Sequence, residues 1–193
     1  MSEDSSQDIS VANRATRKIA RPRLLIGLAA LAVVTALVDQ ITKTIVVTTM
    51  TEGEVISVIP GVLELRFVRN PGAAFSFAGG QTWIFSIIAI AVVVAVVWVA
   101  RRIQSRAWAV VFGLLLGGTI GNLIDRLFRE PGFGIGHVID FLFMPWLMPA
   151  IFNVADIAIT AAAVTFVLLI LLGIGLDGKR QKKEPKPDAQ ANV

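Results

Sequence analysis

Two aspartates stand out because the sequence around them is almost free of charge. Asp140 and Asp156 are the only acids between Glu130 and Asp177. An ionisable side chain in apolar, membrane-like sequence is costly and by default indicates a functional site. Two carboxyl groups that meet can share one proton, because like charges raise the pKa of one of them. Such a pair holds one acid and one base near neutral pH, which is what aspartic-type hydrolysis requires.

Each of these acids also has a structural interpretation. Asp140 could face lipid headgroups, and Asp156 lies near the expected start of a helix, where the macrodipole favours an anion. For either residue alone, structure and function explain the position equally well. Asn153 lies three residues before Asp156 on the same helical face and can hydrogen-bond a carboxylate or a substrate backbone. The combination favours a functional site.

The composition is typical of a membrane protein with several spans. The chain has 193 residues, of which 55% are hydrophobic. It contains no Cys, which excludes disulfides, thiol nucleophiles and Cys-ligated metals. It has a single His and no HExxH motif, which argues strongly against a zinc peptidase. We therefore expect neither a metal nor a cofactor.

Four apolar segments predict a mainly α, integral membrane fold with four transmembrane helices. The expected spans are 24–47, 82–100, 107–124 and 151–176. The first is too long for a signal peptide and continues into polar helical sequence. The third carries a glycine at every fourth position, a spacing that allows close packing of helices in lipid; these glycines are Gly113, Gly117 and Gly121.

The segments between the spans differ in character. Residues 55–59 are rich in β-branched side chains, residues 63–67 alternate with period two, and Pro60-Gly61 between them is a turn signal. We expect a β-hairpin cap over about 50–79, between the first two helices. The Gly/Pro-rich stretch 127–150, between the last two helices, is expected to be a loop or a short helix.

The distribution of charge predicts the orientation in the membrane. Thirteen of the 18 Lys and Arg lie in three segments, namely the arm 1–23, the short loop 101–106 and the tail 177–193. Four spans place these segments on one side, and the positive-inside rule assigns that side to the cytoplasm. The hairpin and the 127–150 loop then face outward from a catalytic membrane domain over 24–176. Since topology explains the positive charge, we expect no nucleic-acid partner.

Helical depth brings polar residues from separate spans to one level. A helix rises about 1.5 Å per residue, so Asp39 and Asn122 lie about 22 Å from the inner ends of their spans. Asp156 lies about 30 Å above the inner end of the fourth span, in a hydrocarbon core about 30 Å thick. The same outer level receives further polar residues from the helices and from the loops: Lys43, Asp125, Arg126, Asn153, Asn70 and Asp140.

Several of these residues also have a structural explanation. Asp39 and Lys43 have the i, i+4 spacing of a helical ion pair, and structure and function explain them equally well. Asp125-Arg126 is better explained as a tie between helices, although Arg126 could also hold a phospholipid headgroup or order the site. Asn122, in a glycine-rich helix, needs a hydrogen-bond partner inside the bundle.

Five blocks of sequence, in this order, resemble lipoprotein signal peptidase (signal peptidase II), a family of bacterial intramembrane aspartic proteases. The resemblance covers about 24–176. The blocks are Asp39-Gln40-Ile41-Thr42-Lys43, Asn70-Pro71-Gly72-Ala73-Ala74-Phe75, the ten residues from Gly117 to Arg126, Val138-Ile139-Asp140-Phe141 and Phe152-Asn153-Val154-Ala155-Asp156.

The resemblance implies that Asp140 and Asp156 are the catalytic dyad. It implies that eight further residues line or support the site, namely Asp39, Lys43, Asn70, Gly72, Asn122, Asp125, Arg126 and Asn153. The implied substrate is a diacylglyceryl-modified prolipoprotein, cut just before the lipidated Cys in the cell membrane. The implied partners also include membrane phospholipid and globomycin-type cyclic peptide inhibitors.

Two other classes of protein remain alternatives at this point. Buried acids also mark proton relays, so a small proton-coupled carrier is one of them. Against it, the polar residues gather at one face, and the inner halves of all four expected spans carry no charge. The other is a non-enzymatic assembly factor in which the acids only pair with Lys43 and Arg126. Retained lipoprotein processing in a double Asp→Asn variant would favour it.

Overall fold

The computed structural model describes residues 22–72 and 82–180. The expected arm, the Ala73-Ala74-Phe75 end of the second block and most of the tail lie outside these residues. Four described helices are long and apolar enough to cross a membrane, which confirms the predicted fold class. In chain order the elements are α2 (Pro22–Thr49), β1 (Val55–Ile59), β2 (Leu63–Asn70), α3 (Thr82–Ala100), α4 (Arg106–Phe128), β3 (Val138–Phe143), β4 (Ile151–Phe152) and α5 (Val154–Leu171).

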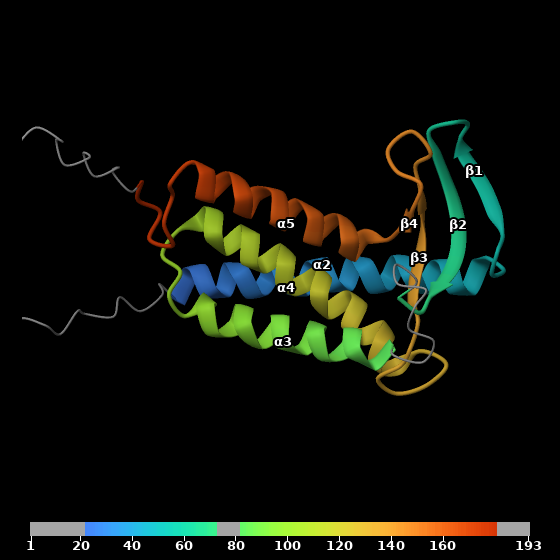
Figure 1. Cartoon of the computed structure of the whole chain (residues 1–193), viewed down its shortest axis with the longest axis horizontal. Helices are drawn as coiled ribbons and strands as arrows, with labels where there is room; N and C mark the ends of the chain where they lie inside the picture. Colours follow the sequence, from blue (N-terminus) through green and yellow to red (C-terminus); the bar gives the residue numbers. More distant parts are fainter. Residues whose placement is uncertain (1–21, 73–81, 181–193) are drawn as a thin grey trace, which may run out of the picture.

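The helices form a bundle, and the β-sheet lies across one end of it (Figure 1). Helix α4 is central, since it contacts α2, α3 and α5. Half of its most apolar window is buried, compared with 17–28% in the other three helices. The start of α2 and the segment after α5 lie together at the end away from the sheet, as four spans require (Figure 1).

Glycines on α4 allow its two closest neighbours to approach. A Cβ atom on Gly117 would lie 2.6 Å from the carbonyl oxygen of Ala32 in α2. A Cβ atom on Gly118 would lie 2.6 Å from the carbonyl oxygen of Ala155 in α5. Real side chains do not fit at these distances, so the expected close packing along the glycine face is confirmed.

Helix α5 is shorter than the predicted span 151–176. It begins at Val154 because Asn153 is its N-cap and Asp156 completes a capping box. It ends at Leu171, shortly before Gly173 turns the chain with a φ of +67°. Asp156 is therefore fifteen residues, or about 22 Å, from the Leu171 end of the helix, not 30 Å. This correction brings Asp156 to the level expected for Asp39 and Asn122.

The sheet has four antiparallel strands in the order β1-β2-β3-β4. The predicted hairpin is confirmed as β1 and β2, with Gly61 at φ +73° in the turn between them. The 127–150 segment differs from the expected loop or short helix, because it contributes β3 to the same sheet, and β4 follows it directly, where the fourth span was expected to begin. Residues Val138 to Phe141 are all buried, so their sequence lacks the polar alternation that identifies a half-exposed strand.

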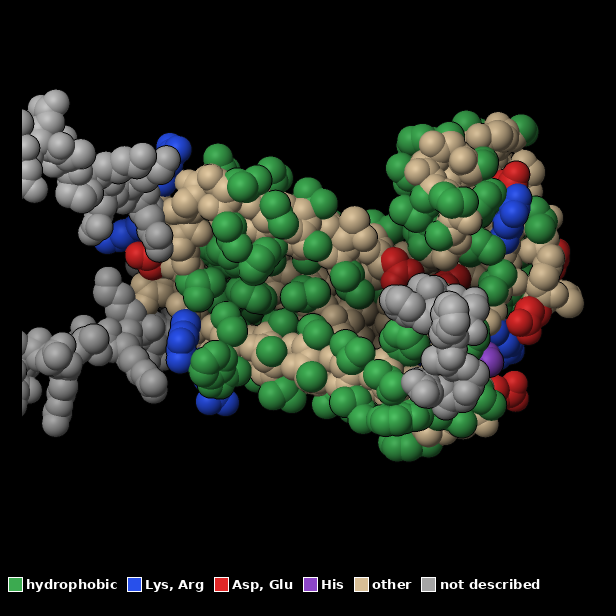
Figure 2. Space-filling model, viewed as in Figure 1, with side chains coloured by type: hydrophobic (Ala, Val, Ile, Leu, Met, Phe, Trp, Pro, Cys, Tyr) green, Lys and Arg blue, Asp and Glu red, His purple; other side chains and the backbone are tan. Residues whose placement is uncertain are grey.

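Two apolar clusters lie above and below the polar level. The inner cluster fills the bundle around Trp108, Val111 and Phe112 of α4. The outer cluster fixes the sheet onto the end of α2; its buried members are Val46, Met50, Phe67, Ile139 and Phe141. Hydrophobic side chains also cover the outside of the bundle, whereas acidic side chains appear where the bundle meets the sheet (Figure 2).

Candidate active site

The sheet supplies one carboxylate and one of the amides that bind it. Asp140 of β3 pairs with Val68 of β2, and Val138 pairs with Asn70, so Asp140 and Asn70 lie diagonally on the same face. The Asn70 amide donates to Asp140 Oδ2 at 2.7 Å. The oxygen of the same amide accepts from the main-chain N–H of Gly72 at 2.8 Å.

The start of α5 supplies the second carboxylate. The main-chain N–H of Asp156 donates to Asn153 Oδ1 at 3.0 Å, and the main-chain N–H of Asn153 donates to Asp156 Oδ2 at 3.1 Å. The amide nitrogen of Asn153, a fully buried residue, donates to Asp140 Oδ1 at 2.7 Å. Asn153 therefore donates to both carboxylates and joins them into one site.

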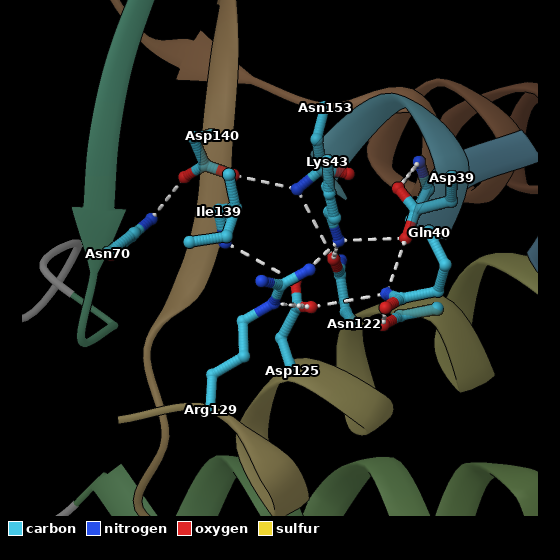
Figure 3. A network of polar contacts seen from close by, with 12 residues as sticks. Asp39, Gln40, Lys43, Asn70, Asn122, Asp125, Arg129, Ile139, Asp140 and Asn153 are labelled. Atoms are coloured by element: carbon cyan, nitrogen blue, oxygen red, sulfur yellow. Dashed lines mark hydrogen bonds and ion pairs between the residues drawn. The ribbon is translucent and has the colours of Figure 1, made fainter. Parts of the chain in front are cut away.

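Helices α2 and α4 complete the polar layer (Figure 3). The fully buried Lys43 binds Asp39 Oδ2 at 2.8 Å and Asp125 Oδ2 at 2.7 Å, which confirms the predicted i, i+4 ion pair. Its third contact is Asn122 Oδ1, at 2.8 Å. The amide nitrogen of Asn122 donates in turn to Asp156 Oδ1 at 2.9 Å.

Two side chains that the sequence analysis did not predict, those of Gln40 and Arg129, bind the second carboxylate oxygen of Asp125. Gln40 donates to Asp125 Oδ1 at 3.1 Å and to the carbonyl of Gly121 at 2.9 Å. Arg129 binds Asp125 Oδ1 at 2.6 Å. Arg129 is four residues after Asp125, the same spacing as Asp39 and Lys43, so this signal was present in the sequence. Gln40 lies within the first sequence block.

Main-chain groups bind the two deeper acids as well. The N–H of Ala155 donates to Asp39 Oδ1 at 2.9 Å, so α2 is tied to the start of α5. The N–H of Ile139 donates to Asp125 Oδ2 at 3.3 Å, which ties β3 to α4. The structural explanation that was favoured for Asp125 agrees with these contacts. They also fix the two elements that carry Asp140 and Asp156.

The two carboxylates of the site differ in exposure. Asp140 is only 3% exposed, and burial raises the pKa of its carboxyl to about 6. The amides of Asn70 and Asn153 and the charge of Lys43 oppose this shift, whereas the charge of Asp156 adds to it. Asp156 is half-buried. Within the described parts of the chain, no Lys or Arg lies at ion-pair distance from either carboxylate.

The structure brings eight of the ten predicted residues into one hydrogen-bonded network. Gly72 lies at its edge, where a φ of +104° and the ring of Phe85 exclude a side chain. Arg126 is the exception, since its guanidinium lies over the Phe85 ring at 4.9 Å and hydrogen-bonds none of the network residues. Its Nη1 is buried without a hydrogen-bond partner among the described residues.

Solved structures identify the class of protein. Two structures described as bacterial membrane enzymes match this chain, with TM-scores of 0.67 and 0.69 and identities of 32% and 30%. The matches cover 75% and 83% of this chain and 92% and 94% of theirs. The chain therefore has the fold of a multi-pass bacterial membrane enzyme.

Sequence comparison identifies the family. The sequence model of signal peptidase (SPase) II matches residues 31–172. A lipoprotein signal peptidase of Leifsonia xyli is 58% identical over 160 residues, which are 83% of this chain and 74% of that protein. One of Rhodococcus jostii is 40% identical over 182 residues, 94% of this chain and 90% of that protein. The chain belongs to the signal peptidase II family, aspartic peptidases that process prolipoproteins. This decides against the carrier and the assembly factor.

Proposed function

We propose that Asp140 and Asp156 are the catalytic dyad of this peptidase, and that it cuts diacylglyceryl-modified prolipoproteins just before the lipidated Cys. The observation that carries the proposal is the position of Asn153. Its side chain donates to Asp140 at 2.7 Å, and its main-chain N–H donates to Asp156 at 3.1 Å. Two carboxylates held by one residue, and bound by uncharged donors, are free to exchange protons with water and substrate.

In the proposed reaction, one carboxylate takes a proton from a water molecule, and the water oxygen attacks the carbonyl carbon of the scissile peptide bond. The other carboxyl, protonated at the start, gives its proton to the carbonyl oxygen. Collapse of the tetrahedral intermediate breaks the C–N bond, the leaving amine takes up the proton that came from the water, and the hydroxyl formed from the carbonyl oxygen returns its proton to the second carboxylate. The dyad titrates as a unit, so its two apparent pKa values belong to the pair.

The surroundings of the dyad support entry of substrate from the side of the sheet. The surface is hollowed between the bundle and the sheet, and acidic side chains lie at the bottom of this hollow (Figure 2). The outside of α2 and α5 is apolar, so the acyl chains of the substrate can stay in lipid beside these helices. The β1–β2 hairpin and the 127–150 segment would hold the peptide over the dyad.

Topology and partners form the second part of the proposal. The basic segments 1–23, 101–106 and 177–193 face the cytoplasm, and residues 24–176 form the catalytic domain in the cytoplasmic membrane. The dyad then lies towards the outer leaflet. Arg126, which hydrogen-bonds no other residue of the network, is available to a phospholipid headgroup or to the substrate. Globomycin-type cyclic peptides, the inhibitors implied by the sequence resemblance, would occupy the same hollow.

The test is cleavage of a diacylated lipobox peptide by the purified protein in detergent. We expect wild type to cut before the lipidated Cys, and Asp140→Asn and Asp156→Asn to lose about 10²–10⁴-fold in rate, the usual contribution of a general acid or base. Thr44→Val is a matched control, since this exposed hydroxyl bonds only its own helix at Gln40. Cleavage at the wild-type rate by a folded Asp156→Asn protein would show that the dyad assignment is wrong.

A further inference from the structure

Lys43 uses all three of its ammonium protons inside the protein. An ammonium group has three donors and no acceptor. Its three partners are Asp39 Oδ2 at 2.8 Å, Asp125 Oδ2 at 2.7 Å and Asn122 Oδ1 at 2.8 Å. The residue is fully buried, so water does not compete for these contacts. Two of the three contacts neutralise acids, whereas the third goes to an uncharged amide.

The third contact determines which way the Asn122 amide faces. Because Lys43 can only donate, the atom of Asn122 that faces it must be the carbonyl oxygen. The NH₂ group then points the other way, where it donates to Asp156 Oδ1 at 2.9 Å. This orientation follows from the donor inventory and does not depend on telling O from N in the side chain.

The other two amides of the site are fixed by a different kind of donor. Asn153 Oδ1 accepts from the main-chain N–H of Asp156, and Asn70 Oδ1 accepts from the main-chain N–H of Gly72. Both amides then donate to Asp140. The oxygen of the amide that donates to Asp156 instead accepts its shorter bond, at 2.8 Å, from the charged side chain of Lys43, and a longer one, at 3.2 Å, from the Asn153 amide. A cation on the carbonyl oxygen also polarises the amide and strengthens its N–H as a donor.

We propose that Lys43 is a positioning residue of the active site, which holds and polarises the Asn122 amide so that Asp156 is favoured as the ionised, water-activating member of the dyad. This inference rests on the dyad assigned under Proposed function. It leaves Asp140 as the protonated member that gives its proton to the substrate carbonyl. Lys43 reaches neither carboxylate directly and acts through Asn122.

The surroundings of the two acids agree with this division of roles. Asp156 is half-buried in the first turn of α5, where the helix dipole favours an anion, and each of its oxygens accepts a hydrogen bond. Asp140 is almost fully buried, which raises the pKa of its carboxyl to about 6. A carboxyl has about four lone-pair sites, so Asn70 and Asn153 leave room on Asp140 for a proton.

Other charged groups face Asp156 and have to be kept constant in a test. These groups are Asp140 from β3, Arg126 from α4, and Asp39 and Lys43 from α2. Removal of Lys43 alone would leave the buried Asp39 without a cation and would change the field at the dyad. The double variant Lys43→Met/Asp39→Asn removes one charge of each sign. Asp125 keeps Arg129 as its partner at 2.6 Å in this variant.

The experiment is the pH–rate profile of cleavage of a diacylated lipobox peptide, with Lys43→Gln/Asp39→Asn as the charge-matched control. In Lys43→Met/Asp39→Asn, which has the same net charge as wild type, we expect the acidic limb to move to higher pH by about half to one unit relative to wild type, the shift that one ordinary hydrogen bond produces. Lys43→Gln/Asp39→Asn retains a donor to Asn122 and should move the limb less. In an Asn122→Ala background, the removal of Lys43 should cause no further shift.

The outcomes separate this inference from the dyad itself. A purely structural Lys43 would lower the rate by one factor at every pH and leave the limb in place, which would overturn the positioning role alone. Equal shifts with and without Asn122 would also overturn it, because Lys43 would then not act through the amide. A wild-type rate in Asp156→Asn would overturn the dyad and the inference together. If Lys43→Met/Asp39→Asn does not fold, the position of the acidic limb is compared in Lys43→Gln/Asp39→Asn and in Asn122→Ala instead.

Discussion

Two pairs of aspartates lie in the same polar layer, and they differ in the kind of partner that each receives. Asp39 and Asp125 are fully buried and bind cations, namely Lys43 for both and Arg129 for Asp125. Asp140 and Asp156 bind amide and main-chain N–H groups, and within the described residues no cation lies at ion-pair distance from either. The first pair has its charge balanced by cations, whereas the second is held by uncharged donors.

The difference shows that burial alone does not identify a reactive acid in this protein. The most buried carboxylates, those of Asp39 and Asp125, are paired with cations, and removal of either negative charge would leave a buried cation without its partner, which is costly. Neutral donors orient a carboxylate without fixing it as an anion. Asp39 and Asp125, here called the cationic pair because they bind cations, tie α2, α4, α5 and β3 together. Two of these elements, β3 and α5, carry Asp140 and Asp156, here called the neutral-bonded pair.

The largest expected effect comes from breaking the cationic pair. Asp125→Ala leaves Arg129 and one contact of Lys43 without an acceptor in the interior, so we expect a loss of about 3–5 kcal/mol in unfolding free energy. Thermal unfolding of the purified protein in detergent measures it. The matched control is Glu64→Gln, in a partly exposed pair with Arg66, which should cost no more than about 1 kcal/mol. Equal losses would show that the two kinds of pair do not differ.

The neutral-bonded pair should show the opposite behaviour, with a clear pH dependence. Burial raises the pKa of Asp140 from 3.8 to about 6, so the folded state binds its proton more tightly than the unfolded state. The Asp140 carboxyl therefore does not lower the free energy of unfolding at low pH. It lowers this free energy progressively as pH rises from about 4 to above 6. The shift corresponds to about 3 kcal/mol at 1.36 kcal/mol per unit.

Asp140→Asn removes this ionisation. We expect the difference in stability between variant and wild type to move in favour of the variant by about 2.4 kcal/mol between pH 4 and pH 7, whatever its value at pH 4. The comparison is made on melting temperatures in one detergent at both pH values. A difference that stays constant with pH would mean that Asp140 is not a buried, titrating carboxyl. Glu64→Gln, measured at the same two pH values, provides a baseline for the effect of pH in this detergent.

The parts of the fold that depend on local pattern could be predicted from the sequence. The expected span 82–100 agrees with α3, and the hairpin agrees with β1 and β2, because apolar length and period-two alternation are local signals. Strands β3 and β4 could not be predicted in this way. Residues Val138 to Phe141 of β3 are buried by contacts with β2 and the bundle, so they show no alternation to detect, and β4 has only two residues, too few for a pattern.

The candidate site shows the same limit. The level of Asp39 and Asn122 followed from helical rise, whereas that of Asp156 needed the observed end of α5. The ion pair of Lys43 with Asp39 followed from i, i+4 spacing. The links from Lys43 to Asp125 and Asn122 depend on how α2 meets α4, which spacing within one helix does not contain. The distinction between cationic and neutral partners therefore needed the structure.

The smallest expected effect tests how tightly the cationic pair is packed. A Cβ atom on Gly121 of α4 would lie 2.5 Å from Asp39 Oδ2, so Gly121→Ala has to displace the carboxylate that Lys43 holds. We expect a loss of about 1–3 kcal/mol, the usual cost of overpacking. Gly27→Ala in α2 is the matched control, because nothing lies within 4 Å of its Cβ position and Ala favours a helix. A Gly121→Ala protein as stable as Gly27→Ala would mean that the Asp39 side chain can move without cost, and the contrast between the two acid pairs would then rest on charge and not on packing.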